Sequence, residues 1–404
     1  MADYTVNIPT ESSMQEAVAQ LRVIAAAQAV QAGTKVDAEE YTIEEIENIV
    51  EAGMASTVFS IGDIITTTYT YNGTEYECPF YIVAFEDVEL EDGETVPGMV
   101  LQMAYATIES MAFDNYEAFY YAEDGLSAGT YYITVGSTAA ANNWVSGDTW
   151  QFTLTEAVPE GGYLAGFRLH RDSGKDISSL LVYSYDSDYT LIESVSVSSG
   201  SDGTSLGTVT LAGGDGLNAD QRFAAGYNRW SQSAYRQWLN SSADAGEWWT
   251  SQNDYDLPPD QLSTYAGFMQ GFESDFLACL GKIKVTTALN TVEGFTDTSE
   301  DTYDTFFLPS LEQIYVTPQL SGVEGDYWPY WKRALGLSST EATGSTNADR
   351  ITYLLSNHSS AQLVWLRSAY RSFARSVWYV YSSGGVTSGN AYSSRHCAPA
   401  CVIV

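Results

Sequence analysis

Side chains suited to nucleophilic catalysis or to binding a soft metal are few, with three histidines and four cysteines in 404 residues. The histidines, none of which lies near a nucleophile in a recognisable arrangement, are His170, His358 and His396. Cys397 and Cys401 flank Ala-Pro-Ala and precede Val-Ile-Val, a pattern that indicates a buried terminal strand and inert thiols. A zinc site needs more soft ligands, and Cys78 and Cys279 lack paired spacing. We therefore predict no catalytic residue and no cofactor.

Calcium is the better metal candidate, because the loops at 215–220 and 253–256 are rich in oxygen ligands. The candidate ligands are Asp215, Asn218 and Asp220. Neither loop matches a complete calcium loop, and Asx-rich turns have the same composition. The prediction is therefore that no metal is bound. No glycine-rich phosphate loop follows a predicted strand, so nucleotide binding has no support.

The last 39 residues differ in composition from the rest of the chain. They contain four arginines and no Lys, Asp, Glu, Gln or Met, whereas the whole chain has a formal charge of −35. They are also rich in Tyr, Ser, Gly and Asn, the mixture that antibody loops use for adaptable contacts. An ordinary Ser/Tyr-rich pair of surface strands would have the same composition, so composition alone leaves both readings open.

Length and charge exclude several classes of protein. A chain of 404 residues predicts two to three domains. The net charge of −35 argues against nucleic acid as a partner and against adsorption to anionic lipid. The sequence has neither the pattern of a secretory signal nor an apolar stretch of membrane-spanning length. Four cysteines are too sparse for a disulfide framework, which favours synthesis in a reducing cytoplasm.

Two amphipathic helices are predicted near the start of the chain. Ser13 and Glu16 form a capping-box signature, and apolar residues follow at helical spacing as far as Ala29. Thr42 and Glu45 open a second helix in the same way. One such helix is marginal in water, so the first must pack against something. It packs either on its own domain or in a small parallel bundle that ties protomers together.

From about residue 57 the apolar period changes to two, which predicts strands. The first strands are predicted at residues 59–61, 64–71 and 79–86, with Asn72-Gly73 as a hairpin turn. Further short strands are predicted at residues 130–135, 149–155, 164–169, 180–185 and 191–197. This spacing is typical of a β-sandwich of roughly 100 residues. Residues 198–220 are rich in Ser, Gly and Asp and are predicted to form a loop or linker.

Helical patterning returns after this linker. A helix is predicted over residues 226–240, where Trp230, Ala234, Trp238 and Leu239 share a face. Residues 261–280 are predicted to be helical in part, and a further helix is predicted to start at Ser310. Beyond residue 351 a short helix leads into a β-rich tail. The chain is thus expected to combine short helices with many strands.

Several motifs of the C-terminal half occur together in a known family. They are Arg236-Gln-Trp-Leu-Asn240, Phe306-Phe-Leu-Pro-Ser-Leu-Glu312, Trp365-Leu-Arg-Ser-Ala369, Trp378-x-Val380-x-Ser-Ser-Gly384-x-Val386, Ala391 and Cys397-Ala-Pro-Ala-Cys-Val-Ile403. With them the chain resembles the variable proteins of diversity-generating retroelements, which tailed phages of gut bacteria carry. The resemblance covers about residues 220–404, and residues 57–110 resemble the opening strands of the same domain.

The resemblance implies an α+β protein with a C-terminal C-type-lectin-like domain, a fold related to the formylglycine-generating enzymes. Residues 1–55 are then a helical anchor or oligomerisation segment, and residues 56–112 are the opening strands of the lectin-like domain. Residues 113–219 form an all-β, Ig-like sandwich inserted into it. Residues 220–404 complete the lectin-like domain and carry its variable part.

In this family an error-prone reverse transcriptase rewrites adenines in the last segment of the gene. Mutated AAY-type codons cannot encode Lys, Glu, Gln, Met or Trp, and the first four are absent after Gln362. The implied variable, ligand-binding positions are Leu363, Tyr370, Ser372, Phe373, Arg375, Ser376, Tyr379, Tyr381, Gly385, Thr387, Ser388, Gly389, Asn390, Tyr392, Ser393 and Arg395. The implied framework positions are Arg236, Trp238, Trp365, Arg367, Trp378, Val380, Val386 and Pro399. His396 stands where the pattern predicts a framework Arg, which puts the outermost framework contact in doubt.

Strand alternation gives a physical reason why such a segment tolerates change, since neighbouring residues point to opposite faces. The residues expected to pack inward are Trp378, Val380, Val386 and Ala391, and those expected to face solvent are Tyr379, Tyr381, Thr387 and Tyr392. Substitutions in the outward set change stability little but alter the contact surface. Tyr and Arg in that set are typical binding hot spots.

The resemblance therefore implies a non-enzymatic ligand-display protein on the virion surface, made in the cytoplasm of the bacterial host. Its variable face would bind a host-cell-surface protein or glycan, and its N-terminus would contact other virion proteins. A homo-oligomer is expected, with a slight preference for a trimer, and neither nucleic acid nor membrane insertion is expected. Two alternatives remain: a formylglycine-generating-type oxidase that uses Cys397 and Cys401, and a purely structural decoration protein of head or tail.

Overall fold

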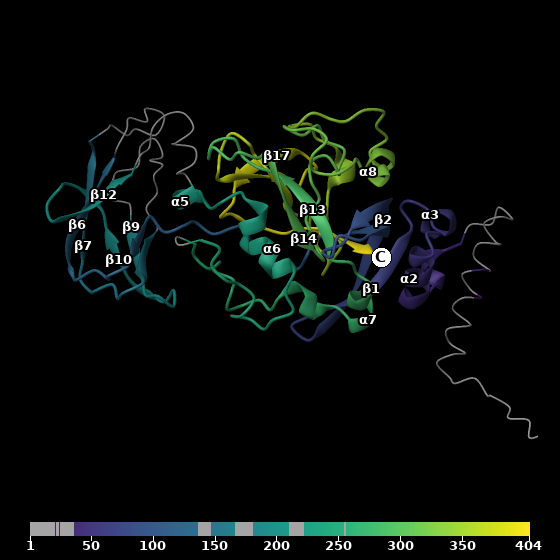
Figure 1. Ribbon diagram of the computed structural model, residues 1–404, viewed down its shortest axis with the longest axis horizontal. Helices are drawn as coiled ribbons and strands as arrows, with labels where there is room; N and C mark the ends of the chain where they lie inside the picture. Colours follow the sequence, from purple (N-terminus) through teal and green to yellow (C-terminus); the bar gives the residue numbers. More distant parts are fainter. Residues whose placement is uncertain are drawn as a thin grey trace, which may run out of the picture.

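The computed structural model describes residues 21, 24, 36–135, 147–165, 181–209, 222–253 and 256–404. Its regular structure is mostly strands arranged in several sheets, with short helices around them (Figure 1). The expected mainly-β, α+β class is therefore confirmed. Among the described residues, no helix is both long enough and apolar enough to span a membrane.

The central sheet has the strand order β1-β2-β3-β19. Its strands are β1 (Ile64–Tyr71), β2 (Thr74–Glu89), β3 (Thr95–Met103) and β19 (Ala400–Ile403). Asn72 and Gly73 join β1 to β2 with φ angles of 49° and 73°, as the predicted Asn-Gly hairpin requires. β19 runs antiparallel to β3, and Leu101 lies opposite Cys401. The last segment of the chain thus completes a sheet begun more than 300 residues earlier.

Short helices and aromatic rings cover this sheet. The helices on this side of the molecule are η1 (Ala38–Glu40), α2 (Ile43–Glu51), α3 (Ala55–Val58), η5 (Phe268–Gly271) and α7 (Ser274–Ala278). The capping box predicted for α2 is present, because Thr42 and Glu45 exchange hydrogen bonds with each other's backbone N–H groups. Phe272 stacks on Phe306 with ring centroids 5.3 Å apart and contacts Phe268 at 5.1 Å. These rings form part of the largest core.

The β-sandwich lies at one end of the molecule, on the left of Figure 1. One sheet contains β5 (Tyr120–Ala122), β8 (Gly162–Ala165), β9 (Leu181–Tyr185) and β10 (Leu191–Ser196). The other contains β6 (Gly129–Val135), β7 (Thr149–Leu154), β11 (Ser198–Ser199) and β12 (Thr204–Val209). Trp150, Phe152, Leu164 and Val182 from the two sheets share a core separate from the main one. The sandwich therefore has an apolar interior of its own.

β12 was not predicted, because residues 198–220 have the composition of a linker. In the structure β12 pairs in parallel with β6, and Thr204 lies opposite Tyr131. An edge strand is held mainly by backbone hydrogen bonds to a single neighbour, so small polar residues suffice there. The prediction of an irregular linker is wrong for residues 204–209.

The remaining elements surround the C-terminal sheet. This sheet has the order β15-β16-β17, formed by β15 (Val364–Ala369), β16 (Ser376–Val380) and β17 (Val386–Asn390). Two smaller sheets pair β13 (Ile283–Ala288) with β14 (Ser299–Asp304), and β4 (Met111–Ala112) with β18 (Ser394–Arg395). The helices of this half are α5 (Arg222–Ala225), η4 (Trp230–Gln232), α6 (Ala234–Leu239), α8 (Pro329–Ala334) and η6 (Ala348–Arg350).

Four helix or strand predictions differ from the structure. The short helix predicted beyond residue 351 is absent, since residues 351–363 form turns and isolated bridges before β15. The helix predicted over 226–240 is broken into η4 and α6, because Ser233 adopts an extended conformation and caps α6 by accepting a hydrogen bond from the Arg236 N–H. Residues 311–315 form turns instead of a helix, with Tyr315 at a φ of 66°. Residues 59–61 follow α3 and form no strand. Apart from Leu21 and Ile24, the predicted helix from residue 14 to 29 lies outside the described residues.

Candidate functional site

The C-terminal sheet separates two apolar clusters. Trp378 and Val380 of β16 pack into a cluster with Leu366 and Val386. Val377 and Tyr379, the alternate residues of the same strand, pack into the main core. β16 is thus covered on both faces, as its fully buried pattern also indicates. Ligand contacts must therefore come from the edge strand β17 and from the connecting loops.

Arg367, a buried arginine of β15, anchors this strand to the neighbouring segments. Arg367 is 1% exposed, and its Nη1 donates to the Leu308 carbonyl at 2.7 Å and to Gln313 Oε1 at 2.6 Å. Its Nη2 donates to the Glu324 carbonyl at 2.5 Å. Burial lowers the pKa of Arg367 to about 10, although the Glu324 carboxylate acts in the opposite direction. Arg367 therefore stays charged at neutral pH and holds the connection between β14 and α8 against the sheet at three points.

The other framework positions are also placed in the interior or near it. Trp238, Trp365 and Val386 are at most 1% exposed. Arg236 is one-quarter exposed and pairs through Nε with Asp304 Oδ1 at 2.6 Å. The remaining framework positions, all buried, are Arg367, Trp378, Val380 and Pro399. The framework thus forms the support beneath the variable positions.

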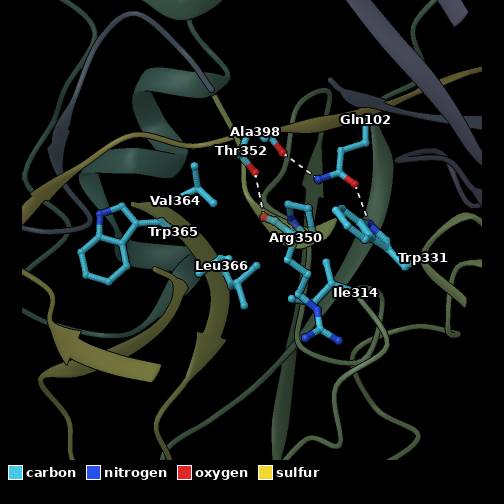
Figure 2. Close-up of a pocket in the computed structure, with 11 residues that line it drawn as sticks. Gln102, Ile314, Trp331, Arg350, Thr352, Val364, Trp365, Leu366 and Ala398 are labelled. Atoms are coloured by element: carbon cyan, nitrogen blue, oxygen red, sulfur yellow. Dashed lines mark hydrogen bonds between the residues drawn. The ribbon is translucent and has the colours of Figure 1, made fainter. Parts of the chain in front are cut away.

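A small cavity of about 20 Å³ lies between this support and the central sheet (Figure 2). Gln102 of β3 crosses it, accepting from the Trp331 indole N–H at 2.9 Å and donating to the Ala398 carbonyl at 3.3 Å. Arg350 lines the same cavity, is 1% exposed, and pairs with Glu341 at 2.6 Å. A volume of this size holds about one water molecule, so the cavity is part of the packing and not a ligand site.

Asn228 fixes the loop between β15 and β16 through the loop backbone. Its side chain is fully buried, and Nδ2 donates to the carbonyls of Phe373 at 2.6 Å and Ser376 at 2.9 Å, with a longer contact to Tyr370 at 3.4 Å. Its backbone N–H donates to the Ala374 carbonyl at 2.7 Å. None of these contacts uses a side chain of the loop, so the loop keeps its path when its side chains change.

Two further residues outside the variable positions hold this region in the same way. The Thr291 hydroxyl and backbone N–H both donate to the Arg371 carbonyl, at 2.9 and 2.7 Å. The Tyr235 hydroxyl donates to the Arg395 carbonyl at 3.2 Å. Every acceptor is a backbone oxygen, which any substituted residue also provides.

The sixteen predicted variable positions differ in exposure. Those that are exposed are Ser372, Tyr381 and Thr387. Those that are half-buried are Leu363, Tyr370, Phe373, Arg375, Gly385, Ser388, Gly389, Asn390, Tyr392, Ser393 and Arg395. The two buried positions are Ser376 and Tyr379, which are 6% and 7% exposed. Most of the set therefore reaches the surface at least in part.

The expectation that Tyr379 faces solvent is wrong. Its ring packs edge-on against Trp365 with centroids 5.6 Å apart, on the face of β16 that meets the main core. Ser376, another predicted ligand-binding position, is buried at the start of β16, where its carbonyl accepts from Asn228. The prediction from strand alternation assumes that one face of a strand is exposed, whereas both faces of β16 are buried. Ala391, Trp378, Val380 and Val386 are buried as predicted, and Tyr381 is 46% exposed.

Arg395 forms a cation–π cluster with Trp365 and Tyr379. Its guanidinium carbon lies 3.9 Å from the Tyr379 ring centroid and 4.3 Å from that of Trp365. Its Nε is buried and has no hydrogen-bond partner among the described residues. A Cβ at Gly389, on the neighbouring strand, would lie 2.7 Å from Arg395 Nη2. Positions 389 and 395 therefore compete for the same space.

A second cluster lies on the loop after β15. Tyr370 stacks on Phe373 with centroids 5.4 Å apart and contacts Trp378 at 5.3 Å. Arg375 lies over Phe373 at 4.9 Å and donates to Asn390 Oδ1 at 2.6 Å. Burial lowers the pKa of Arg375. Half-buried arginines beside aromatic rings can stack on planar groups and bind carboxylates or phosphates, so this surface is chemically suited to recognition.

Asn228 and the Arg395 cluster were not found from the sequence. Asn228 precedes the predicted motif at Arg236 and carries no local signal, because its three acceptors lie more than 140 residues away. The Arg395 cluster joins residues from three strands, and their pairing depends on the register of the sheet. An unexplained buried Asn beside a tryptophan-rich helix was the only available hint.

The candidate metal and thiol sites are accounted for as follows. Asp215, Asn218 and Asp220 lie outside the described residues, and no group of three or more acids, histidines or cysteines within the described part is placed to hold a metal. Asp256 is buried, accepts from the Gln252 N–H at 2.8 Å, and has its pKa raised by burial to about 7.

The four cysteines are buried and free. Burial raises the pKa of Cys397 to about 12.

Two of the histidines are described, and each has a structural partner. His358 stacks on Tyr105 with ring centroids 3.9 Å apart. The Nδ1 atom of His396 lies 2.8 Å from the Thr107 carbonyl oxygen, so it joins the tail to the loop after β3 without the predicted Arg. His170 lies outside the described residues. Neither described histidine adjoins a cysteine arranged for nucleophilic attack.

Comparison with known proteins gives one match. The model of a domain of unknown function, DUF6273, matches residues 206–404. The match begins within β12 and includes the C-terminal sheet, its framework positions and β19. No curated protein and no solved structure matches the chain. The sixteen predicted variable positions therefore lie inside the matched region.

Proposed function

We propose that this protein is a non-enzymatic ligand-display protein of a phage virion and that it binds a host-cell-surface molecule through its C-terminal variable surface. The observation that carries the proposal is the way the loop between β15 and β16 is held. Asn228 and Thr291 fix it through backbone carbonyls, while the side chains of the loop are largely available for contact. Such an arrangement suits a segment whose sequence changes while its backbone does not.

The proposal includes the finer assignments of fold and origin. The C-terminal part would be a C-type-lectin-like domain of the type found in variable proteins of diversity-generating retroelements, and the Ig-like sandwich would act as a spacer. The N-terminal segment would attach the protein to other virion proteins and assemble it as a homo-oligomer, with a trimer as the working assumption. Several copies on one particle would raise affinity through multivalency.

The formylglycine-type oxidase is the less favoured alternative. A reactive cysteine pair needs accessible thiols with lowered pKa values. Cys397 and Cys401 are fully buried, and burial raises both pKa values. A purely structural decoration protein is also less favoured, because it would not need two arginine–aromatic clusters at half-buried positions of a surface that is otherwise acidic.

The direct test is binding of the labelled full-length protein to a panel of gut bacterial isolates. Replacing the three exposed variable residues together (Ser372→Ala, Tyr381→Ala and Thr387→Ala) is expected to weaken binding about tenfold or more, or roughly 1.4 kcal/mol. The matched control replaces the exposed sandwich residues Tyr121 and Leu191 by Ala and is expected to leave binding unchanged. Equal binding by both variants would contradict the proposal.

A second test addresses the origin of the variation. Related copies of this gene should differ mainly at the sixteen positions given above, and a near-identical template repeat should lie beside a reverse-transcriptase gene. Differences spread evenly over the sandwich and the C-terminal sheet would contradict a diversity-generating mechanism. This test is independent of which molecule the protein binds.

A further inference from the structure

A separate cleft lies between the β-sandwich and the segments 246–251 and 257–263. Its volume is about 660 Å³, within the range of about 300–1,000 Å³ that is typical of small-molecule sites. One wall is the hairpin between β9 and β10, and the other is the loop that follows α6. None of the sixteen variable positions lines it. The cleft is therefore distinct from the surface proposed above.

Aromatic side chains join the two walls. Tyr189 stacks on Tyr163 of the sandwich with centroids 5.2 Å apart and meets Trp249 of the opposite wall edge-on at 5.4 Å. Tyr163 and Leu257 share a small core beneath the cleft. Asn115 also donates to the Pro258 carbonyl at 2.7 Å. The two walls are thus held together by side-chain packing and a hydrogen bond as well as by the covalent chain that connects them.

Two features of the cleft are compatible with a ligand site. Tyr189 has a φ of 61°, a conformation that non-glycine residues adopt rarely and that often marks functional sites. Trp249 is only 8% exposed, and its indole N–H has no hydrogen-bond partner among the described residues. The neighbouring Trp248 instead donates to the Tyr265 carbonyl at 2.7 Å. An unpaired buried donor destabilises the protein unless a ligand or water accepts from it.

The charges around the cleft restrict what can bind. Asp188 and Asp260 line it and are exposed, and no Lys, Arg or His is among its lining residues. Anionic ligands are therefore repelled. A ligand must offer an acceptor to the Trp249 N–H and donors to the two carboxylates. Hydroxyl groups do both, whereas a quaternary ammonium group, although attracted by the carboxylates and the aromatic rings, offers no acceptor to the N–H.

We infer that this cleft binds a neutral saccharide. The apolar faces of a sugar ring pack on the rings of Tyr189 and Trp249, the indole N–H donates to a sugar oxygen, and sugar hydroxyls donate to Asp188 and Asp260. The inference stands whether or not the variable surface binds a host receptor, because it depends on different residues.

The test is calorimetric titration of the full-length protein with the methyl glycosides of glucose, galactose, mannose and N-acetylglucosamine, beside glucuronate, sialic acid and choline. At least one neutral glycoside is expected to bind. Trp249→Phe keeps the ring but removes the N–H, and should weaken that binding about three- to tenfold. Asp260→Asn should weaken it as well, since a carboxylate accepts more strongly than an amide.

Controls separate loss of this site from general loss of folding. Thermal unfolding should show both variants folded, and Glu94→Gln, at an exposed position outside both the cleft and the proposed variable surface, should bind the glycoside as the unchanged protein does. The inference is overturned if no neutral glycoside binds, if Trp249→Phe and Asp260→Asn both bind normally, or if only choline or the acidic sugars bind.

Discussion

The central sheet and the C-terminal sheet are held in different ways. In the sheet β1-β2-β3-β19, side chains such as Phe80, Leu101 and Val402 are 0% exposed, and they determine the packing. The loop that joins strands of the sheet β15-β16-β17 is instead fixed through its backbone carbonyls by Asn228 and Thr291. In one sheet the side chains determine the packing. In the other, the hydrogen bonds that hold the loop use its backbone and not its side chains.

The largest expected effect is in the central sheet. Leu101→Ala removes a fully buried side chain that lies between Ile82 and Cys401 on the adjacent strands. The free energy of unfolding should fall by about 2–5 kcal/mol, because a cavity forms where the side chain was. Urea titration followed by circular dichroism measures it. Leu191→Ala, at a site 51% exposed, is the control and should stay within about 0.5 kcal/mol.

The next effect is a pH dependence that originates beside the central sheet. Glu109 accepts from the Tyr69 hydroxyl at 2.5 Å, and burial raises its pKa from 4.5 to about 7. Between these values the folded state holds a proton that the unfolded chain releases. The resulting stability is complete below about pH 4.5 and is lost as pH rises through 7, an effect of roughly 3 kcal/mol.

The measurement is the melting temperature from pH 5 to 8, which should fall as pH rises. The net charge of −35 acts in the same direction, so the comparison of variants is decisive. Burial also raises the pKa values of Glu86, Glu117 and Asp256 to about 7, so Glu109→Gln should reduce the slope without abolishing it. Glu94→Gln at an exposed turn should leave the slope unchanged. Equal slopes for both variants would show that Glu109 is not the source.

A smaller loss of stability is expected when the residue that holds the backbone of the loop between β15 and β16 is replaced. Asn228→Ala leaves the Phe373 carbonyl without its donor and removes one of two donors to the Ser376 carbonyl, which keeps the Tyr370 N–H, so the free energy of unfolding should fall by about 1–3 kcal/mol. Thr387→Ala, at an exposed predicted variable position, should cost less than about 0.5 kcal/mol. Equal stability of the two variants would contradict the conclusion that this loop is held through its backbone by Asn228.

The smallest effect tests coupling within the variable surface. Gly389→Ala places a Cβ 2.7 Å from Arg395 Nη2, the flexible end of that side chain, so it should destabilise the protein by about 1 kcal/mol or less. With Arg395→Ser already present, the same substitution should be nearly neutral. A double-mutant cycle should give a coupling energy of roughly 0.5–1 kcal/mol. Strict additivity would contradict the proposed competition for space.

Much of the fold could be predicted from local patterns. The Asn72-Gly73 hairpin and the α2 capping box were predicted correctly, since each depends on residues only one to three positions apart. The strands β1, β6, β7, β9 and β10 were also predicted to within a few residues. β12 and the break before α6 could not be predicted, because pairing with β6 and tertiary packing override local composition.

The site was predicted less completely than the fold. The burial of Trp378, Val380 and Val386 follows from strand alternation, and it was predicted correctly. Tyr379 was placed on the wrong side, because alternation does not show that a second core covers the other face of β16. Asn228 lay beyond prediction, since its role depends on loops that only the tertiary structure brings together. The metal candidates at residues 215–220 lie outside the described residues.

The position of β19 after the variable segment has a consequence for how variants survive in the cell. A frameshift or a premature stop codon within residues 363–396 removes β19 and leaves the edge of β3, including Val100 and Leu101, without its partner. The exposed edge and apolar surface would mark such products for proteolysis. Only a chain translated in frame through residues 363–396 can finish the sheet, so the fold makes the survival of the product depend on an intact reading frame.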